Sequence, residues 1–237
     1  MNDVVIVEAV RTPVGRRNGG LSTSHSVDLL GTVQKALFER SGVDPSDGGQ
    51  AVCGCVGQGG MQAMNVTRTA WLSAGLPLSA PATTVDAQCG SSQQATNLAY
   101  ALVASGTVDV AVGCGVELMS RVGFGATTPK DPNSGRPINR NYFDHFEFTS
   151  QFEGSERIAD QWGISRTDTD TFGVMSQERA ARAWDEDRFG TQIIPMEVPA
   201  LGEDGEISEE TVMISKDEGL RETTMESLAA LKPTGRK

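Results

Sequence analysis

The sequence has 237 residues, of which 38% are hydrophobic and 22% charged, and its formal net charge is −11. Such a composition is typical of a folded globular protein, and the acidic balance argues against nucleic acid as a partner, because phosphate-backbone binding needs a basic face. The opening MNDVVIVEAV lacks the marks of a secretory signal and no apolar run is long enough to span a membrane, so we expect a cytoplasmic protein that does not bind membranes.

Strand and helix patterns alternate along the first 120 residues. Short apolar runs bounded by glycine or proline predict strands over residues 3–10, 50–57, 83–85 and 108–113. Amphipathic spacing predicts helices from Ser26 to Ser41, over residues 65–74 and after Cys89. This alternation predicts an α/β fold built from β-α-β units around a mostly parallel sheet.

The pattern changes around Ser120. Residues 121–150 contain three prolines and no clear periodicity. Two helices are predicted beyond them, one over residues 153–162 and one that begins at Ser165, where Asp168 completes a capping-box-like start. We therefore divide the chain into an α/β domain of residues 1–120 and a second unit of residues 121–237.

The stretch TTVDAQCGSSQQATNLAYALVASG, residues 83–106, places Cys89 where a loop turns into a helix. The partial positive charge of a helix N-terminus favours thiolate over thiol, and a thiolate is a strong nucleophile. Gly90 leaves space beside the sulfur for a substrate carbonyl. The alternative is that Cys89 is a small buried apolar residue.

Other polar and sulfur-containing motifs give weaker indications of metal binding or catalysis. Cys53-Gly-Cys55 has no accompanying histidine or cysteine cluster, so we expect two small buried side chains and no metal site. His25 and His145 lie in contexts that do not identify either as a base for Cys89. Glu117 follows a buried strand, where it could act in catalysis or organise loops through backbone N–H groups.

Five segments together resemble the thiolase family of acyl-CoA acetyltransferases. They are VIVEAVRTPVGRRNGGL, VDAQCGSSQQA, GCGVELMSR, ERIADQWGISRTDTDTFGVMSQERAARAWDEDRF and GLRETTMESLAALKP. The resemblance implies a thiolase-like fold, with an N-terminal β-α-β half over residues 1–120 and an inserted loop domain over residues 121–237 that covers coenzyme A. It also implies that the family's second α/β half is absent from this sequence.

The resemblance implies a reaction as well. Cys89 would be the acyl-thioester nucleophile in thiolytic cleavage of a 3-oxoacyl-CoA to acetyl-CoA or propionyl-CoA and a shortened acyl-CoA, with Gly90 and Glu117 near the site. Its backbone N–H would contribute to an oxyanion hole, and Arg221 would contact coenzyme A. The implied partners are acyl-CoA and coenzyme A, both as substrates, and a second copy in a homodimer or tetramer formed through the first domain. No permanently bound cofactor is implied.

The sequence departs from the family pattern in two places. Many thiolases have His-Met-Gly where this chain has Gln151 and Phe152 in SQFEGSE, and together with the loop RVGFGATT this resembles the branch that acts on bulky sterol-derived thioesters. We therefore expect Gln151 and Phe152 to contact substrate. The family's second half, which holds a Gly-His-Pro histidine and a C-x-G cysteine, is not found here. We expect the isolated chain to be catalytically impaired, because groups that act as a unit fail together.

Two alternatives to a thiolase remain open. A β-ketoacyl synthase-like condensing enzyme would share the fold and the nucleophilic cysteine but would take its acyl groups from acyl carrier protein. A non-catalytic coenzyme A-binding or dimerisation module would need no reactive cysteine.

Overall fold

The structure, a computed structural model, describes residues 3–128, 131–202, 206–234 and 236. These residues form two compact units: residues 1–128 with 191–219, and residues 129–190 with 220–237. Residues 191–219 thus group with the first unit, whereas the sequence placed them in a second unit that starts at residue 121. The role of the second unit as a cover for coenzyme A stays a prediction.

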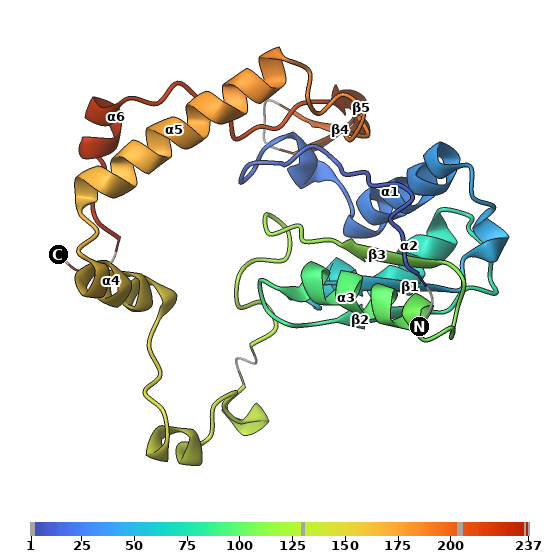
Figure 1. The fold of residues 1–237 in the computed structure, drawn as a ribbon, viewed down its shortest axis with the longest axis horizontal. Coiled ribbons are helices and arrows are strands. Elements are labelled where there is room, and N and C mark those ends of the chain that lie inside the picture. Colours follow the sequence, from blue (N-terminus) through green and yellow to red (C-terminus); the bar gives the residue numbers. More distant parts are fainter. Residues whose placement is uncertain (1–2, 129–130, 203–205, 235, 237) are drawn as a thin grey trace. The chain divides into compact units, whose positions relative to one another are not determined.

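The first unit is built on a parallel sheet with the strand order β2-β1-β3 (Figure 1). Its strands are β1 (Gln50–Gly54), β2 (Ala82–Val85) and β3 (Ala111–Gly115). Three helices accompany them, α1 (Ser26–Ser41), α2 (Val66–Ser73) and α3 (Ser91–Ala104). The predicted β-α-β pattern is therefore confirmed from residue 26 to residue 115, with strand bounds that move by up to three residues.

Helices α1 and α2 pack against one face of the sheet. One apolar cluster joins residues of both helices to β1 and its end, namely Val27, Leu30, Cys53, Cys55, Val66 and Ala70. A second cluster is centred on Phe38 and Trp71, whose rings meet edge to face at a centroid distance of 5.6 Å. The buried indole N–H of Trp71 donates to the carbonyl oxygen of Pro77, so the ring is fully buried without an unpaired donor.

Helix α3 covers the opposite face and approaches the strands very closely. A Cβ atom added to Gly54 of β1 would lie 2.2 Å from the carbonyl carbon of Ser91 and from the nitrogen of Ser92, and one added to Gly113 of β3 would lie 2.9 Å from the Cα of Thr96. Strand backbone and helix backbone therefore touch where side chains would normally keep them apart. This contact fixes the start of α3 against the sheet.

The strand predicted over residues 3–10 is wrong. These residues have no strand pairing, and Val5, Ile6 and Val7 are between 65% and 86% exposed. A strand needs a hydrogen-bonded neighbour, and the sheet of the described residues ends at β3 without reaching this segment. At the end of the segment, Arg11 N–H donates to the carbonyl oxygen of Gln192, and Ile194 N–H donates to the carbonyl oxygen of Arg11.

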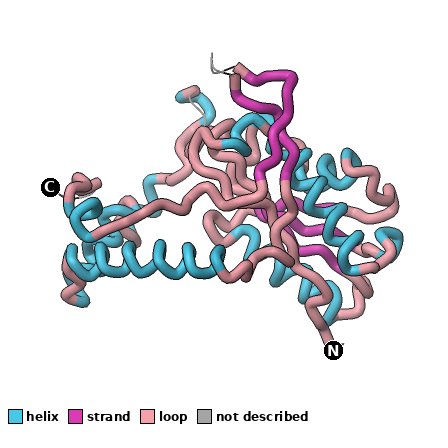
Figure 2. The backbone as a smooth tube through the Cα atoms, turned by 90° about the horizontal axis from the view of Figure 1, so that it is seen from above, coloured by secondary structure: helices cyan, strands magenta, loops and turns pink. Residues whose placement is uncertain are grey.

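An antiparallel hairpin completes the first unit, formed by β4 (Met196–Leu201) and β5 (Ile207–Ile214) and visible as the long magenta pair in Figure 2. Its register shifts between Pro199 and Leu201, as expected where proline interrupts a strand. Beyond β5, the Asp217 carboxylate forms a bidentate pair with Arg11, with N–O distances of 2.7 and 3.0 Å.

The second unit is mostly helical. It contains α4 (Gln151–Trp162), α5 (Arg166–Asp185) and α6 (Met225–Ala229). The capping box predicted for Ser165 and Asp168 is confirmed, since each side chain bonds the other's backbone. Each unit also contains short 3₁₀ turns. The first unit has them at Gly20–Thr23, Pro45–Asp47 and Gly60–Gln62, and the second at Pro132–Ser134 and Arg140–Asp144. Among the residues described, no helix is both long and apolar enough to cross a membrane.

Candidate active site

Three loops of the first unit leave the carboxyl ends of the parallel strands. Residues 86–90 follow β2, residues 55–62 follow β1, and residues 116–122 follow β3. Because the strands are parallel, these loops emerge at the same edge of the sheet, which is where open α/β sheets place their ligand sites. Cys89 lies on the first loop and Glu117 on the third.

The turn that carries Cys89 has a strained and tightly hydrogen-bonded backbone. Gln88 has a φ of 52°, in the left-handed region that non-glycine residues seldom adopt. Its N–H donates to the Asp86 carboxylate over 2.7 Å. The Ser91 hydroxyl accepts from Ala87 N–H at 2.9 Å and donates to the Gln88 carbonyl oxygen at 2.5 Å. Ser91 is only 4% exposed, so it locks the turn from its buried side.

The arrangement leaves the Cys89 side chain exposed at the start of α3. The backbone N–H groups of Ser92 and Gln93 have no hydrogen-bond acceptor within the part of the chain that the structure describes. They give this helix start the partial positive charge that favours an anion nearby. The observed position is thus that of an accessible cysteine, and the alternative of a buried apolar residue is wrong.

The backbone conformation at residue 90 does not require a glycine. Its φ is −90°, and an added Cβ would meet only the Ala87 carbonyl oxygen, at an ordinary 3.4 Å. The backbone would therefore accept a larger residue at this position. That glycine leaves open space next to the Cys89 sulfur stays a prediction.

The cysteines on the sheet differ from Cys89 in their surroundings. Cys53 and Cys55 are at most 1% exposed and face α1 and α2, as the C-x-C spacing predicts. Burial, helped by the negative charge of Glu117, raises the pKa of Cys55 to about 12. The neighbouring Cys114 thiol and burial raise the pKa of Cys53 still further. Thiols of this kind are unreactive at neutral pH.

Glu117 joins the loops that follow β1 and β3. Its carboxylate accepts from the backbone N–H groups of Val56 at 2.9 Å and Gly57 at 3.2 Å, and from the side-chain amide of Gln62 at 2.9 Å. Gln62 is fully buried, and its carbonyl oxygen accepts from Leu118 N–H at 2.7 Å and from the Ser26 hydroxyl at 3.1 Å. These contacts are those of a group that organises loops.

Neither histidine contacts Cys89 through a hydrogen bond in the described structure. His25 is the N-cap of α1, and its Nδ1 accepts from Val27 N–H over 3.2 Å. His145 ends a short 3₁₀ turn of the second unit, with its ring beside Phe146. No group of three or more histidine, cysteine or acidic side chains is placed to hold a metal ion, as far as the described residues go.

The remaining predicted site residues lie in the second unit. Gln151 and Phe152 open α4 directly after its N-cap Ser150, and both are exposed. Arg221 is exposed, with its backbone N–H donating to the side chain of Gln177 at 3.2 Å. The two units are described separately, so the proposed contacts of these three residues with substrate stay predictions.

Comparison with known proteins decides the family. The model of the thiolase N-terminal domain matches residues 4–237. The chain belongs to the thiolase family. The thiolase-like fold expected from the sequence is therefore confirmed, with a parallel sheet at its centre.

Several curated thiolases are similar over nearly the whole chain. Steroid 3-ketoacyl-CoA thiolase FadA6 of Mycobacterium tuberculosis is 37% identical, with 98% of this chain and 56% of that protein covered. Beta-ketoadipyl-CoA thiolase of Pseudomonas aeruginosa is 35% identical, with coverages of 98% and 59%. A probable acetyl-CoA acyltransferase of Staphylococcus aureus is 32% identical, with coverages of 100% and 61%. This thiolase chain thus spans somewhat more than half the length of these relatives.

Sequence reasoning missed the residues that hold the candidate nucleophile of this thiolase in place. Ser91 reads as an ordinary N-terminal helix residue, although its hydroxyl bridges Ala87 and Gln88. Gly54 reads as a small residue between two cysteines, although its lack of a side chain lets the backbone of α3 approach β1 closely. Gln62 follows a glycine-rich turn that gives no sign of a buried amide. Serine and glycine are common at such positions, so the sequence alone does not mark these residues as important. Their roles become visible only in contacts between segments that are remote in sequence.

Proposed function

We propose that this chain is the nucleophile-bearing part of an acyl-CoA acyltransferase that cleaves a 3-oxoacyl-CoA by thiolysis. The observation that carries the proposal is an exposed cysteine, Cys89, on a locked turn at the start of a helix in a thiolase chain. The buried Cys53 and Cys55, by contrast, lie in surroundings that keep them protonated.

The proposed reaction has two halves. The Cys89 thiolate adds to the 3-keto carbon, and the oxyanion formed there is stabilised by backbone N–H groups, that of Cys89 among them. The bond between C2 and C3 then breaks, C2 takes a proton, and acetyl-CoA or propionyl-CoA leaves. The shortened acyl group stays on Cys89 as a thioester. A second coenzyme A attacks that thioester, and Cys89 is released as the thiolate.

The thiolate also needs a base, and no described residue offers one within hydrogen-bond distance of Cys89. We assign the base to the part of the thiolase fold that this sequence does not contain. Arg221 is proposed as a coenzyme A contact, because a guanidinium suits phosphate and adenine binding. Gln151 and Phe152 are proposed to face the acyl group, and pairing of two copies through the first unit belongs to the same proposal.

For the acyl group we propose a bulky 3-oxoacyl chain. The support is the similarity to a steroid 3-ketoacyl-CoA thiolase, at 37% identity, and the presence of Gln151 and Phe152 in SQFEGSE. Beta-ketoadipyl-CoA thiolases are almost as similar, at 35% identity, so a small dicarboxylic acyl group is the competing substrate class.

The test is acyl transfer to the purified chain, followed by intact-protein mass spectrometry and peptide mapping. Prolonged incubation with an acyl-CoA is expected to leave one acyl group on Cys89, slowly because the proposed base is absent, and none on a Cys89→Ser variant. An acyl group on another residue would contradict the proposal. Acylation by acyl carrier protein thioesters but not by acyl-CoA would favour the condensing enzyme, and a Cys89 that reacts with iodoacetamide no faster than free cysteine would favour a non-catalytic module.

A further inference from the structure

Two cysteines lie side by side on neighbouring strands of the parallel sheet. Cys53 of β1 and Cys114 of β3 are direct partners in the strand register. Cys53 belongs to the apolar cluster that joins the sheet to α1 and α2, and Cys114 packs against the same cluster. Both side chains therefore lie on one face of the sheet, where their thiols form a hydrogen bond with each other.

The spacing of the two strands suits a disulfide between these residues. Neighbouring strands lie about 4.7–4.9 Å apart, and disulfides join residues whose Cα atoms are about 4.4–6.8 Å apart. Cys55 is placed differently, although it belongs to the same cluster. It follows Gly54, the last residue of β1, and its sulfur accepts a hydrogen bond from the Gln62 side-chain amide at 3.4 Å.

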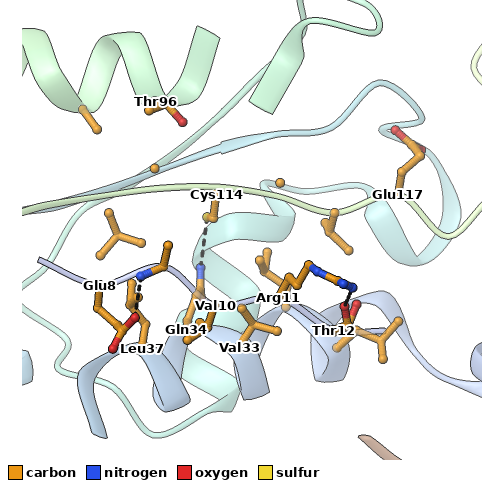
Figure 3. A pocket seen from close by; sticks show the side chains of 18 of the residues that line it. Glu8, Val10, Arg11, Thr12, Val33, Gln34, Leu37, Thr96, Cys114 and Glu117 are labelled. Atoms are coloured by element: carbon orange, nitrogen blue, oxygen red, sulfur yellow. Dashed lines mark hydrogen bonds between the residues drawn. The ribbon is translucent and has the colours of Figure 1, made fainter. Parts of the chain in front are cut away.

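The two partners differ in how readily they ionise. The Cys114 sulfur accepts a hydrogen bond from the Gln34 side-chain amide at 3.8 Å, drawn in Figure 3, and its own thiol lies 3.5 Å from the Val52 carbonyl oxygen. The hydrogen bond from Cys53, helped by that from Gln34, lowers the pKa of Cys114 against the effect of burial. The same hydrogen bond and burial raise the pKa of Cys53. Cys114 is thus the nucleophile of the pair, and Cys53 keeps its proton.

Cys114 is also the partner that a small reagent can reach. It is half-buried and lines a cavity of about 1350 Å³, whereas Cys53 is fully buried and is not part of the lining. In Figure 3, the Cys114 side chain points toward Gln34 of α1 and away from Thr96 of α3. Cys89 is not part of the lining either, so this thiol pair is separate from the candidate active site.

We propose that Cys53 and Cys114 form a redox-sensitive pair, which hydrogen peroxide closes to a disulfide between β1 and β3. The Cys114 thiolate attacks one peroxide oxygen, the O–O bond breaks, and the hydroxide that leaves takes up the proton released by Cys114. The Cys53 sulfur then attacks the Cys114 sulfenic acid, its S–O bond breaks, and the hydroxyl group leaves with the Cys53 proton as water. The two thiols lose two electrons, and the peroxide is reduced to two waters.

The test uses the Cys89→Ser chain, so that the exposed thiol does not compete for the oxidant. The reduced protein is treated with hydrogen peroxide, unfolded in guanidinium chloride with iodoacetamide, and studied by intact-protein mass spectrometry and peptide mapping. Of the four cysteines of the chain, three remain in this variant, and the number of labelled thiols is expected to fall from three to one. The linked peptide should join Cys53 to Cys114 and carry the label on Cys55. Dithiothreitol should restore all three thiols.

Serine variants in the same background make the test specific to the pair. Cys53→Ser removes the thiol that resolves the sulfenic acid, so dimedone should trap at least about tenfold more sulfenic acid on Cys114 than in the parent. Cys114→Ser should give neither the disulfide nor the dimedone adduct. Cys55→Ser, at the other buried cysteine of the cluster, is the matched control and should keep the disulfide. Thermal unfolding of each reduced variant checks that it is folded.

Three results would overturn the proposal. One is a Cys114 that stays reduced or is oxidised without forming a bond to Cys53. Another is a disulfide that includes Cys55. The third is a link between Cys53 and Cys114 that forms as fast in the guanidinium-unfolded chain as in the folded chain, because the fold would then not be what brings the two thiols together. No readout involves acyl transfer, so a failure here and a failure at Cys89 are distinguishable.

Discussion

The hydroxyl of Ser91 donates to the carbonyl oxygen of Gln88 over 2.5 Å and closes the turn that presents Cys89. The same hydroxyl accepts from Ala87 N–H, so one buried side chain satisfies two backbone groups on either side of a left-handed residue. Strained backbone persists only where its surroundings over-determine it. The position of the candidate nucleophile therefore depends on a residue two places further along the chain.

Replacing Ser91 with alanine is expected to loosen this turn. Two hydrogen bonds would be lost, although the Gln88 carbonyl oxygen would keep the Ser91 backbone N–H as a donor. At about 0.5–1.5 kcal/mol for each bond, the free energy of unfolding should fall by about 1–3 kcal/mol. The alkylation rate of Cys89 by iodoacetamide should change with it, because Gln88 can then leave the left-handed region. Chemical denaturation and timed alkylation measure the two effects. Ser92→Ala, at the exposed neighbour, is the control and should alter neither.

Gly54→Ala is expected to displace the start of α3. The new Cβ would lie 2.2 Å from backbone atoms of Ser91 and Ser92, which cannot rotate away as a flexible side chain can. Overpacking of this kind costs about 1–3 kcal/mol or more. Thermal unfolding measures it. The matched control is Gly154→Ala within α4, where nothing lies within 4 Å of the added atom, and a gain of about 0.5–1 kcal/mol is expected.

The Gly90→Ala variant should distinguish the access of substrate to Cys89 from the stability of the fold. The backbone of Gly90 suits alanine, so the unfolding free energy should change by less than about 0.5 kcal/mol. Acylation of Cys89 should nevertheless slow by roughly 10-fold to 100-fold, because a methyl group beside the sulfur displaces the reacting carbonyl. Time-resolved mass spectrometry with acyl-CoA measures the rate. An unchanged rate would show that the space beside Cys89 is not used.

Alkylation under native conditions should distinguish the cysteines. Cys89 is exposed, whereas Cys53 and Cys55 are buried and their pKa values are raised. Iodoacetamide at pH 8 is therefore expected to modify Cys89 first and to spare Cys53 and Cys55 until the chain is unfolded by guanidinium chloride. Peptide mapping before and after unfolding measures the order. Early modification of Cys55 would contradict the burial described for it.

Acid should detach Arg236 from α4. Hydrogen bonds from Arg236 and Arg157 lower the pKa of Glu153 from 4.5 to about 2. A lowered pKa gives stabilisation that is present above pH 4.5 and lost as the pH falls toward 2. Proteolysis of the C-terminal segment by an acid-stable protease should therefore accelerate across that window. Glu153→Gln should show fast cleavage already at pH 5, and an identical pH profile in wild type and variant would contradict the role of this carboxylate.

Local patterns were enough to predict most elements of the chain. Helix α1 ends where Gly42 adopts a φ of 70°, α2 begins after Asn65, and α5 begins at the Ser165 capping box, all as the sequence indicates. These signals work because caps and amphipathic faces are formed by residues within one or two turns of each other. Cys89 was predicted at the start of α3 for the same reason, and the motifs that surround it pointed to the thiolase family.

Only the tertiary structure decided what depends on distant partners. The apolar run of residues 3–10 has every local feature of a strand, yet no strand among the described residues pairs with it. Gly54 and Ser91 gain their roles only when α3 lies against β1. A strand needs a second segment to pair with, and a close backbone contact needs a second segment to pack against. A local sequence pattern describes one segment and does not show which other segment lies beside it. The sequence by itself therefore determined which residues are proposed to do chemistry, and the packing of the sheet determined how they are held.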